Sequence, residues 1–511
     1  MRGTYKATLA KGFAAALIAA VLGGCGSNSP QNIKPATASL ITIIQDAPVC
    51  DAISASLTLT GLNFTPIGGG FPAGYLTTTP AFAPSIRVNL QLLRDFNTVL
   101  YIAPVNAGSY QQATMNVELA QIATYQPGQN PPVSLLTTTL TQPKPIINLN
   151  PPLVITAGQP NVLLLDFNAQ QMLQTDAAGQ LTGTVNPVVN ATQLTATNGN
   201  GFVELDDLSG FVRSTTPISA SGTPLFTGSF LMQLLGPSVS GNPALTMNLT
   251  ANTELIGFVD LPHLLPDSYV EVDASLDSQG NFVGNKVEFQ AVEHPFAGIG
   301  AEATPSTALI GTVTAITTDQ TGYPTQFNLW IRDAEPQDTA NITLDSIFQV
   351  NLNSGTLFQI SALGPNFANL SFGPQNLGVG QEIVVHGAYT KVPSSTGTKS
   401  NLPVTVSPSA IFLKLQSIQG SLGSVVTAGS DGVTGAFVLN PCSTLQQQAP
   451  VYVLTNNQTN FVKVTGLGAL TPQMNLLVKG MPFYEPQGGV FNGVTVPPGT
   501  LVVQAKQVHQ L

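Results

Sequence analysis

The chain has 511 residues and a formal net charge of −10, and only 8 % of its residues are charged although 43 % are hydrophobic. A length of this order predicts about three to five domains. The low charge and the recurring Val, Ile and Thr runs between Gly, Pro and Asn turns predict an all-β exported protein, and the net negative charge argues against a nucleic-acid partner, which needs a basic surface.

Residues 1–24 have the pattern of a secretory leader. Arg2, Lys6 and Lys11 precede an apolar run over residues 13–22. This run is too short to span a membrane as a stable helix. Removal of the leader takes away three basic residues and brings the net charge to −13, with 13 basic and 26 acidic residues left.

The leader ends in Leu-Gly-Gly-Cys, with the cysteine at position 25. This motif resembles the bacterial lipobox, which implies cleavage before Cys25 and acylation of its thiol and amino group. A chance cysteine at an ordinary cleavage site is the alternative. Several acyl chains anchor a protein stably, so residues 25–37 are expected to be a tether to a bacterial cell envelope. No aspartate follows Cys25, and this favours the outer membrane.

Two cysteines remain, Cys50 and Cys442, far apart in the sequence. They are expected to lie in different domains. An exported protein is able to form a disulfide, but we expect two buried free thiols.

Residues 38–195 are predicted to form a first domain. The segments 39–45 and 54–62 are interpreted as strands separated by an Asp-Ala-Pro turn, and Leu57 and Leu59 alternate toward a core. With a Gly-Ser-Tyr strand start at 108–110 and a mostly buried strand at 162–168, this order resembles a bacterial lipoprotein domain of unknown function. The resemblance implies a transthyretin-like β-sandwich and no enzymatic activity.

The rest of the chain is a threefold repeat over residues 200–297, 305–417 and 418–511. Each copy begins with a glycine in an apolar strand and later has a threonine two residues before a hydrophobic residue. The glycines are Gly210, Gly311 and Gly420, and the threonines are Thr253, Thr356 and Thr459. A Val- or Ile-rich strand and a closing strand follow in every copy.

This order resembles a second bacterial domain family of unknown function, which implies three OB-like small β-barrels after the sandwich. Short antiparallel strands with Gly bends suit partly closed barrels. We expect the four domains to form a row that extends from the membrane. Loops at 215–227, 394–407 and 484–498 distinguish the copies, either for binding or as variable surface.

No sequence pattern supplies a catalytic residue, a metal site or a cofactor. His386 is expected to be a hydrogen-bonded residue of a barrel strand. Acidic residues at 204–207 and 267–277 are more typical of the wet face of strands and turns than of a calcium site. Trp330 is the one tryptophan, and it alternates away from Phe327 and Leu329; it is either an exposed ligand contact or packed against a neighbouring domain.

The sequence therefore predicts a non-enzymatic, lipid-anchored envelope protein that acts as a binding or structural display module. Its partners are the membrane, through the lipid, and an envelope polysaccharide or protein. One alternative is a glycan-active hydrolase, which needs two close carboxyl groups, one with a strongly raised pKa. The other is a periplasmic carrier of an apolar ligand, which needs a closed apolar cavity.

Overall fold

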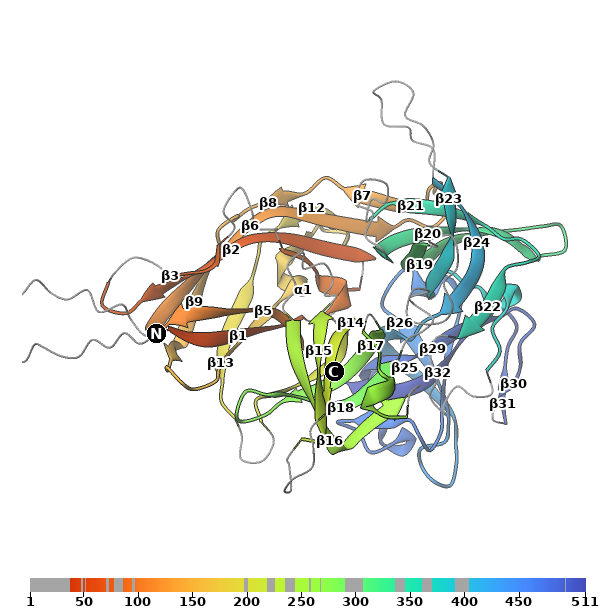
Figure 1. The fold of residues 1–511 in the computed structure, drawn as a ribbon. Helices are drawn as coiled ribbons and strands as arrows, with labels where there is room; N and C mark the ends of the chain where they lie inside the picture. Colours follow the sequence, from red (N-terminus) through yellow and green to blue (C-terminus); the bar gives the residue numbers. More distant parts are fainter. Residues whose placement is uncertain are drawn as a thin grey trace, which may run out of the picture. The chain divides into compact units, whose positions relative to one another are not determined.

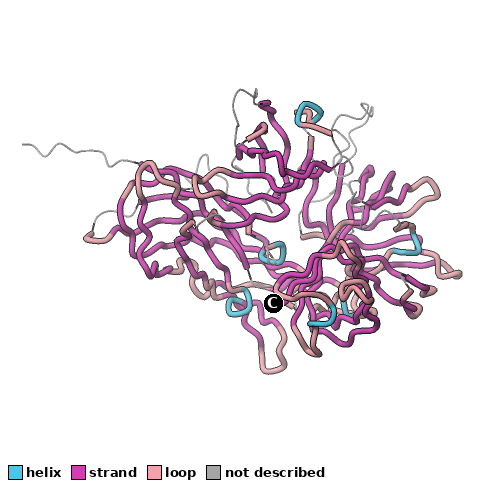
Figure 2. Tube along the Cα trace, turned by 90° about the horizontal axis from the view of Figure 1, so that it is seen from below, coloured by secondary structure: helices cyan, strands magenta, loops and turns pink. Residues whose placement is uncertain are grey.

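A computed structural model describes residues 37–46, 49–50, 52–69, 73–77, 86–93, 97–196, 201–217, 226–234, 244–256, 259–266, 268–289, 307–335, 345–360, 370–390, 404–491 and 493–511. The leader, Cys25 and most of the tether lie outside these residues. Strands make up most of the described chain, and the helices are single short turns (Figure 2). Within those residues, the helices are all too short or too polar to cross a bilayer. The all-β prediction is confirmed.

The first domain is a sandwich of two sheets (Figure 1). One sheet contains β13 (Val189–Leu194), β10 (Asn161–Phe167), β1 (Thr37–Asp46) and β5 (Thr98–Asn106), in this order. The other contains β2 (Ser54–Pro66), β3 (Ala73–Thr77), β4 (Ile86–Asn89), β6 (Gly108–Tyr125), β7 (Val133–Leu136) and β9 (Ile146–Ile155). Smaller elements are η1 (Leu90–Leu92), α1 (Ala169–Met172) and a sheet of β8 (Thr139–Leu140), β11 (Leu173–Thr175) and β12 (Leu181–Val185).

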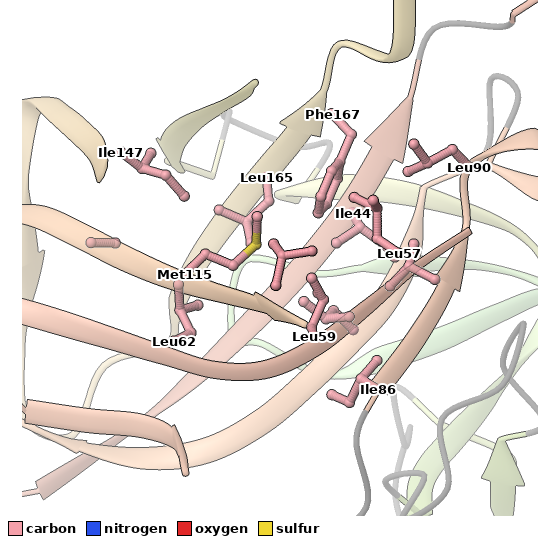
Figure 3. Packing of buried hydrophobic residues seen from close by; sticks show 14 of the residues in the cluster. Ile44, Leu57, Leu59, Leu62, Ile86, Leu90, Met115, Ile147, Leu165 and Phe167 are labelled. Atoms are coloured by element: carbon pink, nitrogen blue, oxygen red, sulfur yellow. The ribbon is translucent and has the colours of Figure 1, made fainter. Parts of the chain in front are cut away.

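Side chains from both sheets meet in one core between them (Figure 3). Leu57 and Leu59 of β2 face Ile44 of β1 and Phe167 of β10 there, and all four are at most 2 % exposed. The predicted inward alternation of β2 is therefore confirmed. The period of two arises because successive side chains of a strand point to opposite faces of the sheet.

Strand β1 is buried on both of its faces. Leu40 and Ile44 enter the sandwich core, whereas Ile41 and Ile43 pack into a second core that includes Leu205 of the next domain. This explains why residues 40–44 form a nearly continuous apolar run, as expected for a strand with no solvent face.

Three small barrels follow the sandwich. The first closes in the order β14 (Val203–Pro217), β15 (Gly228–Leu234), β16 (Ala244–Ile256), β18 (Phe282–Phe289) and β17 (Tyr269–Leu276), with η2 (Leu261–His263) between β16 and β17. The second contains β19 (Thr307–Thr318), β20 (Pro324–Glu335), β21 (Ile347–Asn351), β22 (Leu357–Ile360), η4 (Pro374–Asn376), β23 (Glu382–Thr390) and β24 (Val404–Leu413). The third contains β25 (Gln416–Ala428), β26 (Gly435–Pro441), η5 (Gln446–Gln448), β27 (Val451–Thr455), β28 (Asn460–Val462), η6 (Leu467–Ala469), β29 (Asn475–Glu485), the hairpin β30 (Gly489–Phe491) and β31 (Val494–Val496), and β32 (Thr500–Gln510).

Each barrel closes in the same way. Its third strand runs parallel to its last strand, as β16 does to β18, β21 to β24 and β27 to β32. In barrels 2 and 3 the third strand is divided, and its second part (β22 or β28) also pairs with the last strand. The predicted small β-barrels are confirmed, since each copy is a closed five-stranded barrel.

The repeated glycines mark the place where the first strand of each barrel passes the second. They are Gly210, Gly311 and Gly420. A Cβ atom added at any of them would overlap a main-chain carbonyl oxygen of the second strand. The two backbones approach more closely than a side chain permits, so glycine is required there.

The repeated threonines bridge the interruption of the third strand. They are Thr253, Thr356 and Thr459. Each hydroxyl accepts a hydrogen bond from the backbone N–H three residues earlier, at 2.8, 3.3 and 3.0 Å respectively. Each also donates to a carbonyl oxygen of the last strand, at 2.7, 3.2 and 3.0 Å. The same bonds in three copies show that the repeat is structural.

Cys50 of the sandwich and Cys442 of barrel 3 form a disulfide, with a Cα–Cα distance of 5.0 Å across 392 residues of sequence. The expectation of two free thiols is therefore wrong, because folding brings together segments whose spacing in the sequence gave no reason to pair them. The expected row of domains is also corrected, since the sandwich contacts barrel 1 through β1 and barrel 3 through this bond.

A full chain carrying Cys25→Ser should show no titratable thiol when it is unfolded without reductant, and two after reduction. Cys442→Ser in that chain should lower the free energy of unfolding by about 2–5 kcal/mol, the usual effect of removing a native disulfide. Thiol titration and denaturant unfolding measure the two effects. Two reactive thiols in the unreduced chain would rule out the bond.

Candidate functional site

Trp330, the candidate ligand contact, is packed against a neighbouring domain, which is the second of the two environments expected for it. It is 2 % exposed and packs with Ala123 of β6 and Val133 of β7, in a small cluster between barrel 2 and the sandwich. Its indole N–H has no hydrogen-bond partner among the described residues. Trp330 therefore has no free ring face for a ligand.

A buried ion pair lies in the same interface. Arg87 of β4 contacts Asp345, which lies two residues before the start of β21, and the Asp345 side chain is 3 % exposed. Burial lowers the pKa of the Arg87 guanidinium. Asp345 is held by main-chain hydrogen bonding to Ile331, beside Trp330. These contacts fix barrel 2 against the sandwich, so the charges of Arg87 and Asp345 serve the packing of the two domains.

The acidic side chains of these segments that the structure describes form no metal-binding cluster. Asp277 accepts hydrogen bonds from the N–H groups of Gln279 and Asn281 in its own turn, at 2.9 and 2.8 Å. Asp273 lies opposite Lys286 in the strand register, and Glu271 lies 3.9 Å from Lys414. Asp267 and the side chains at 206 and 207 are outside the described residues. The side chains that the structure describes contain no group of three or more potential metal ligands.

His386 lies in β23, as expected, and is 6 % exposed. Its ring meets the edge of Phe412, with the ring centroids 5.0 Å apart. The environment is a packed outer face of barrel 2 rather than a cleft.

A cavity of about 360 Å³ lies between barrels 2 and 3. Barrel 2 supplies residues of its first hairpin, from 316 to 324, and of the segment 375–379 before β23. Barrel 3 supplies Gln446 and Ala449 around η5, together with Leu501 and residues at the end of β29 and just after it, from 484 to 487. None of the described residues that line it is charged.

Buried amide side chains hold the cavity walls together. Gln381 is fully buried; it donates to the carbonyl of Pro482 in barrel 3 at 3.0 Å and accepts from the N–H of Gly378 at 2.7 Å. Gln416, at the start of barrel 3, donates to the carbonyl of Gly380 and accepts from the N–H of Glu382. Gln381 bonds to both barrels, and Gln416 of barrel 3 bonds to two backbone groups of barrel 2, so these amides fix the walls and the cavity is preformed.

The Gly- and Pro-rich insertion at 484–498 is part of this site. Its hairpin β30–β31 places Val494 and Val496 in the core shared by barrels 2 and 3, and Phe491 packs edge-on against Phe483. The insertion is thus a packed wall, and Tyr484, Pro486 and Gln487 at its beginning line the cavity. The insertions at 215–227 and 394–407 lie largely outside the described residues.

Two carboxyl groups lie near the cavity, and their pKa values are shifted in opposite directions. Burial raises the pKa of Glu485, which accepts a hydrogen bond from the Asn376 side chain at 3.3 Å. Asp319 accepts from the Thr321 hydroxyl and from the N–H groups of Tyr323 and Thr321, and these bonds lower the pKa of its carboxyl. Neither residue lines the cavity, and Asp319 is occupied with its own turn.

The sequence did not indicate this cavity. Its polar residues, such as Gln446 and Gln375, belong to no motif, and they meet only because two barrels pack together. The sequence does contain an Asp-x-x-Gly turn at 319–322, which fixes the first hairpin of barrel 2. A turn of this kind does not by itself indicate a binding site.

Ala123→Glu should release barrel 2 from the sandwich, because a carboxylate cannot be buried beside Trp330 without a partner. We expect a loss of about 3–5 kcal/mol in the free energy of unfolding, as for other uncompensated buried charges. The fluorescence of the single tryptophan should shift to longer wavelength and become accessible to acrylamide. Leu119→Glu, at an exposed position of the same strand, should leave the emission unchanged. Unchanged emission in Ala123→Glu would refute the contact.

One family model matches the chain, over residues of the sandwich. Residues 37–182 match the family model described as "Domain of unknown function (DUF4382)". No curated protein matches the chain. A deletion mutant of the single-stranded DNA binding protein from Thermus aquaticus aligns over 40 % of this chain and 93 % of that chain, with 16 % identity and a TM-score of 0.15, too low to carry an argument. The sandwich thus contains a DUF4382 domain, in the region where the sequence resembles a lipoprotein domain of unknown function.

Proposed function

We propose that this chain is a non-enzymatic, lipid-anchored binding module of the bacterial cell envelope. The observation that carries the binding role is the preformed, uncharged cavity of about 360 Å³ between barrels 2 and 3. Its volume is at the lower end of the range for small-ligand pockets, roughly 300–1,000 Å³. Barrels 2 and 3, two copies of the threefold repeat, provide the frame for this cavity.

The anchor is supported by the sequence alone. A basic start, a short apolar run and the lipobox-like Leu-Gly-Gly-Cys support cleavage before Cys25 and its acylation. The lack of an aspartate after Cys25 favours the outer membrane. The disulfide fits an exported protein, because such bonds persist in oxidising compartments.

A hydrolase is the second candidate, and one observation favours it: the raised pKa of Glu485 near the cavity. A glycosidase needs a second carboxyl group that faces the first across the substrate. Asp319 is engaged by its own turn, with a lowered pKa. An apolar carrier is less favoured still, because hydrogen-bonding side chains form much of the cavity wall.

Cys25→Ser should move the protein from the membrane fraction to the soluble envelope fraction. The physical reason is that the acyl chains supply the attachment, and a net negative surface does not bind anionic lipid head groups. Fractionation and metabolic labelling with palmitate measure the effect. Gly26→Ala is the control and should remain labelled and membrane-bound. A labelled or membrane-bound Cys25→Ser protein would contradict the lipobox.

The detergent-purified full chain should retain envelope polysaccharide or a protein from envelope extract without cleaving it. Glu485→Gln keeps the acceptor for Asn376 and removes the acid, so retention should be unchanged. Release of new reducing ends that Glu485→Gln abolishes would identify a hydrolase instead. Failure to retain any envelope component would leave only a structural role.

A further inference from the structure

We infer that the cavity between barrels 2 and 3 holds an uncharged sugar unit, a ligand with several hydroxyl groups and an apolar ring face. This inference rests on the proposed binding role and names the chemical class of the ligand. It concerns the space between two barrels, formed by loops, the insertion and η5, rather than the open face of any one barrel.

The absence of charge at the described wall excludes ionic ligands. A carboxylate or phosphate that enters a site without a counter-charge loses its hydration and gains no ion pair in return. The chain itself is negative, with a formal charge of −10, so long-range repulsion also disfavours anionic polymers. The ligand class is therefore neutral.

The wall is too polar for a hydrocarbon ligand. Seven of the sixteen lining residues have hydrogen-bonding side chains, namely Thr318, Thr321, Tyr323, Gln375, Gln446, Tyr484 and Gln487. An alkyl chain would strip water from these groups and leave them unsatisfied, at a cost for each. A hydroxyl group of a ligand both donates and accepts hydrogen bonds, so it is able to pair with either the donor or the acceptor atoms of amide and hydroxyl side chains.

Gln446 is the most specific of these groups. Only 8 % of the residue is exposed, it lines the cavity, and its side-chain oxygen has no partner among the described residues. A buried amide oxygen without a hydrogen-bond partner is unfavourable, and a ligand hydroxyl is the simplest donor to this oxygen. The segment that carries Gln446 is fixed, since its N–H donates to the carbonyl of Ser443 and the disulfide holds Cys442.

Apolar surface is present as well. Tyr323, Pro324 and Leu377 of barrel 2 and Tyr484 and Pro486 of barrel 3 all line the cavity. Aromatic rings offer a large apolar face at little entropic cost, and a sugar ring presents C–H groups to such a face.

The test is calorimetric titration of the detergent-purified full chain with neutral trisaccharides of glucose, galactose or mannose. The comparison ligands are trigalacturonate, palmitate and an uncharged tetrapeptide. We expect binding of at least one neutral trisaccharide and none of the comparison ligands. Gln446→Ala should weaken it about tenfold, the effect of losing the hydrogen bonds of one buried carboxamide.

Two controls separate a contact from a structural effect. Gln447→Ala alters the neighbouring exposed glutamine, which donates to the carbonyls of Pro441 and Cys442 and does not line the cavity; it should leave affinity unchanged. Tyr323→Phe should retain binding and Tyr323→Ala should lose it, since the ring face supplies the contact. Equal losses in Gln446→Ala and Gln447→Ala would mean a loosened segment and would overturn the assignment.

Other outcomes overturn the inference in distinguishable ways. Binding of palmitate or the tetrapeptide in place of every sugar would refute the ligand class while the cavity remains a binding site. Retention of envelope material that Gln446→Ala leaves unaffected, with no binding of the trisaccharides, would place the proposed function elsewhere on the chain. If the unaltered full chain retains no envelope material and binds none of the trisaccharides, both proposals are refuted.

Discussion

Closure of the small barrels is the constraint on which the rest of the structure depends. Each barrel closes only because its third strand pairs in parallel with its last strand. Where the pairing of the third strand is interrupted, a threonine hydroxyl accepts a hydrogen bond from the backbone of that strand and donates one to the last strand, as Thr459 does at 3.0 and 3.0 Å. Without this bridge, buried backbone groups at the break would have no partner, which is costly in a core of this size.

The sandwich then makes the barrels into one body. One face of its strand β1 packs into a core shared with barrel 1. It also contacts Trp330 of barrel 2 and is joined to barrel 3 by the disulfide. A domain with so many neighbours cannot act as a flexible spacer module. Its role in the described chain is to fix the barrels, and the apolar surface buried on it is the physical reason that this arrangement is stable.

The cavity exists as a consequence of this packing. Barrels 2 and 3 share a core, and buried amides such as Gln381 and Gln416 satisfy backbone groups across the boundary. Such amides fix the position of the two walls more strictly than apolar contacts do, because hydrogen bonds are directional. The disulfide at Cys442 also constrains the segment that carries Gln446, because Cys442 lies just before Gln446 in the sequence. A preformed wall lowers the entropy that a ligand must lose on binding.

The sequence by itself determined the strand class, the threefold repeat and the inward residues of the first domain, because alternation and repeated Gly and Thr positions are local signals. Leu57 and Leu59 face the core as predicted, and the repeated threonines have one role in all copies. Only the tertiary structure decided that Cys50 meets Cys442, that Trp330 is buried in a domain contact, and that Gln446 lines a cavity. These depend on how folded domains pack, and no spacing along the chain encodes a contact between surfaces 392 residues apart.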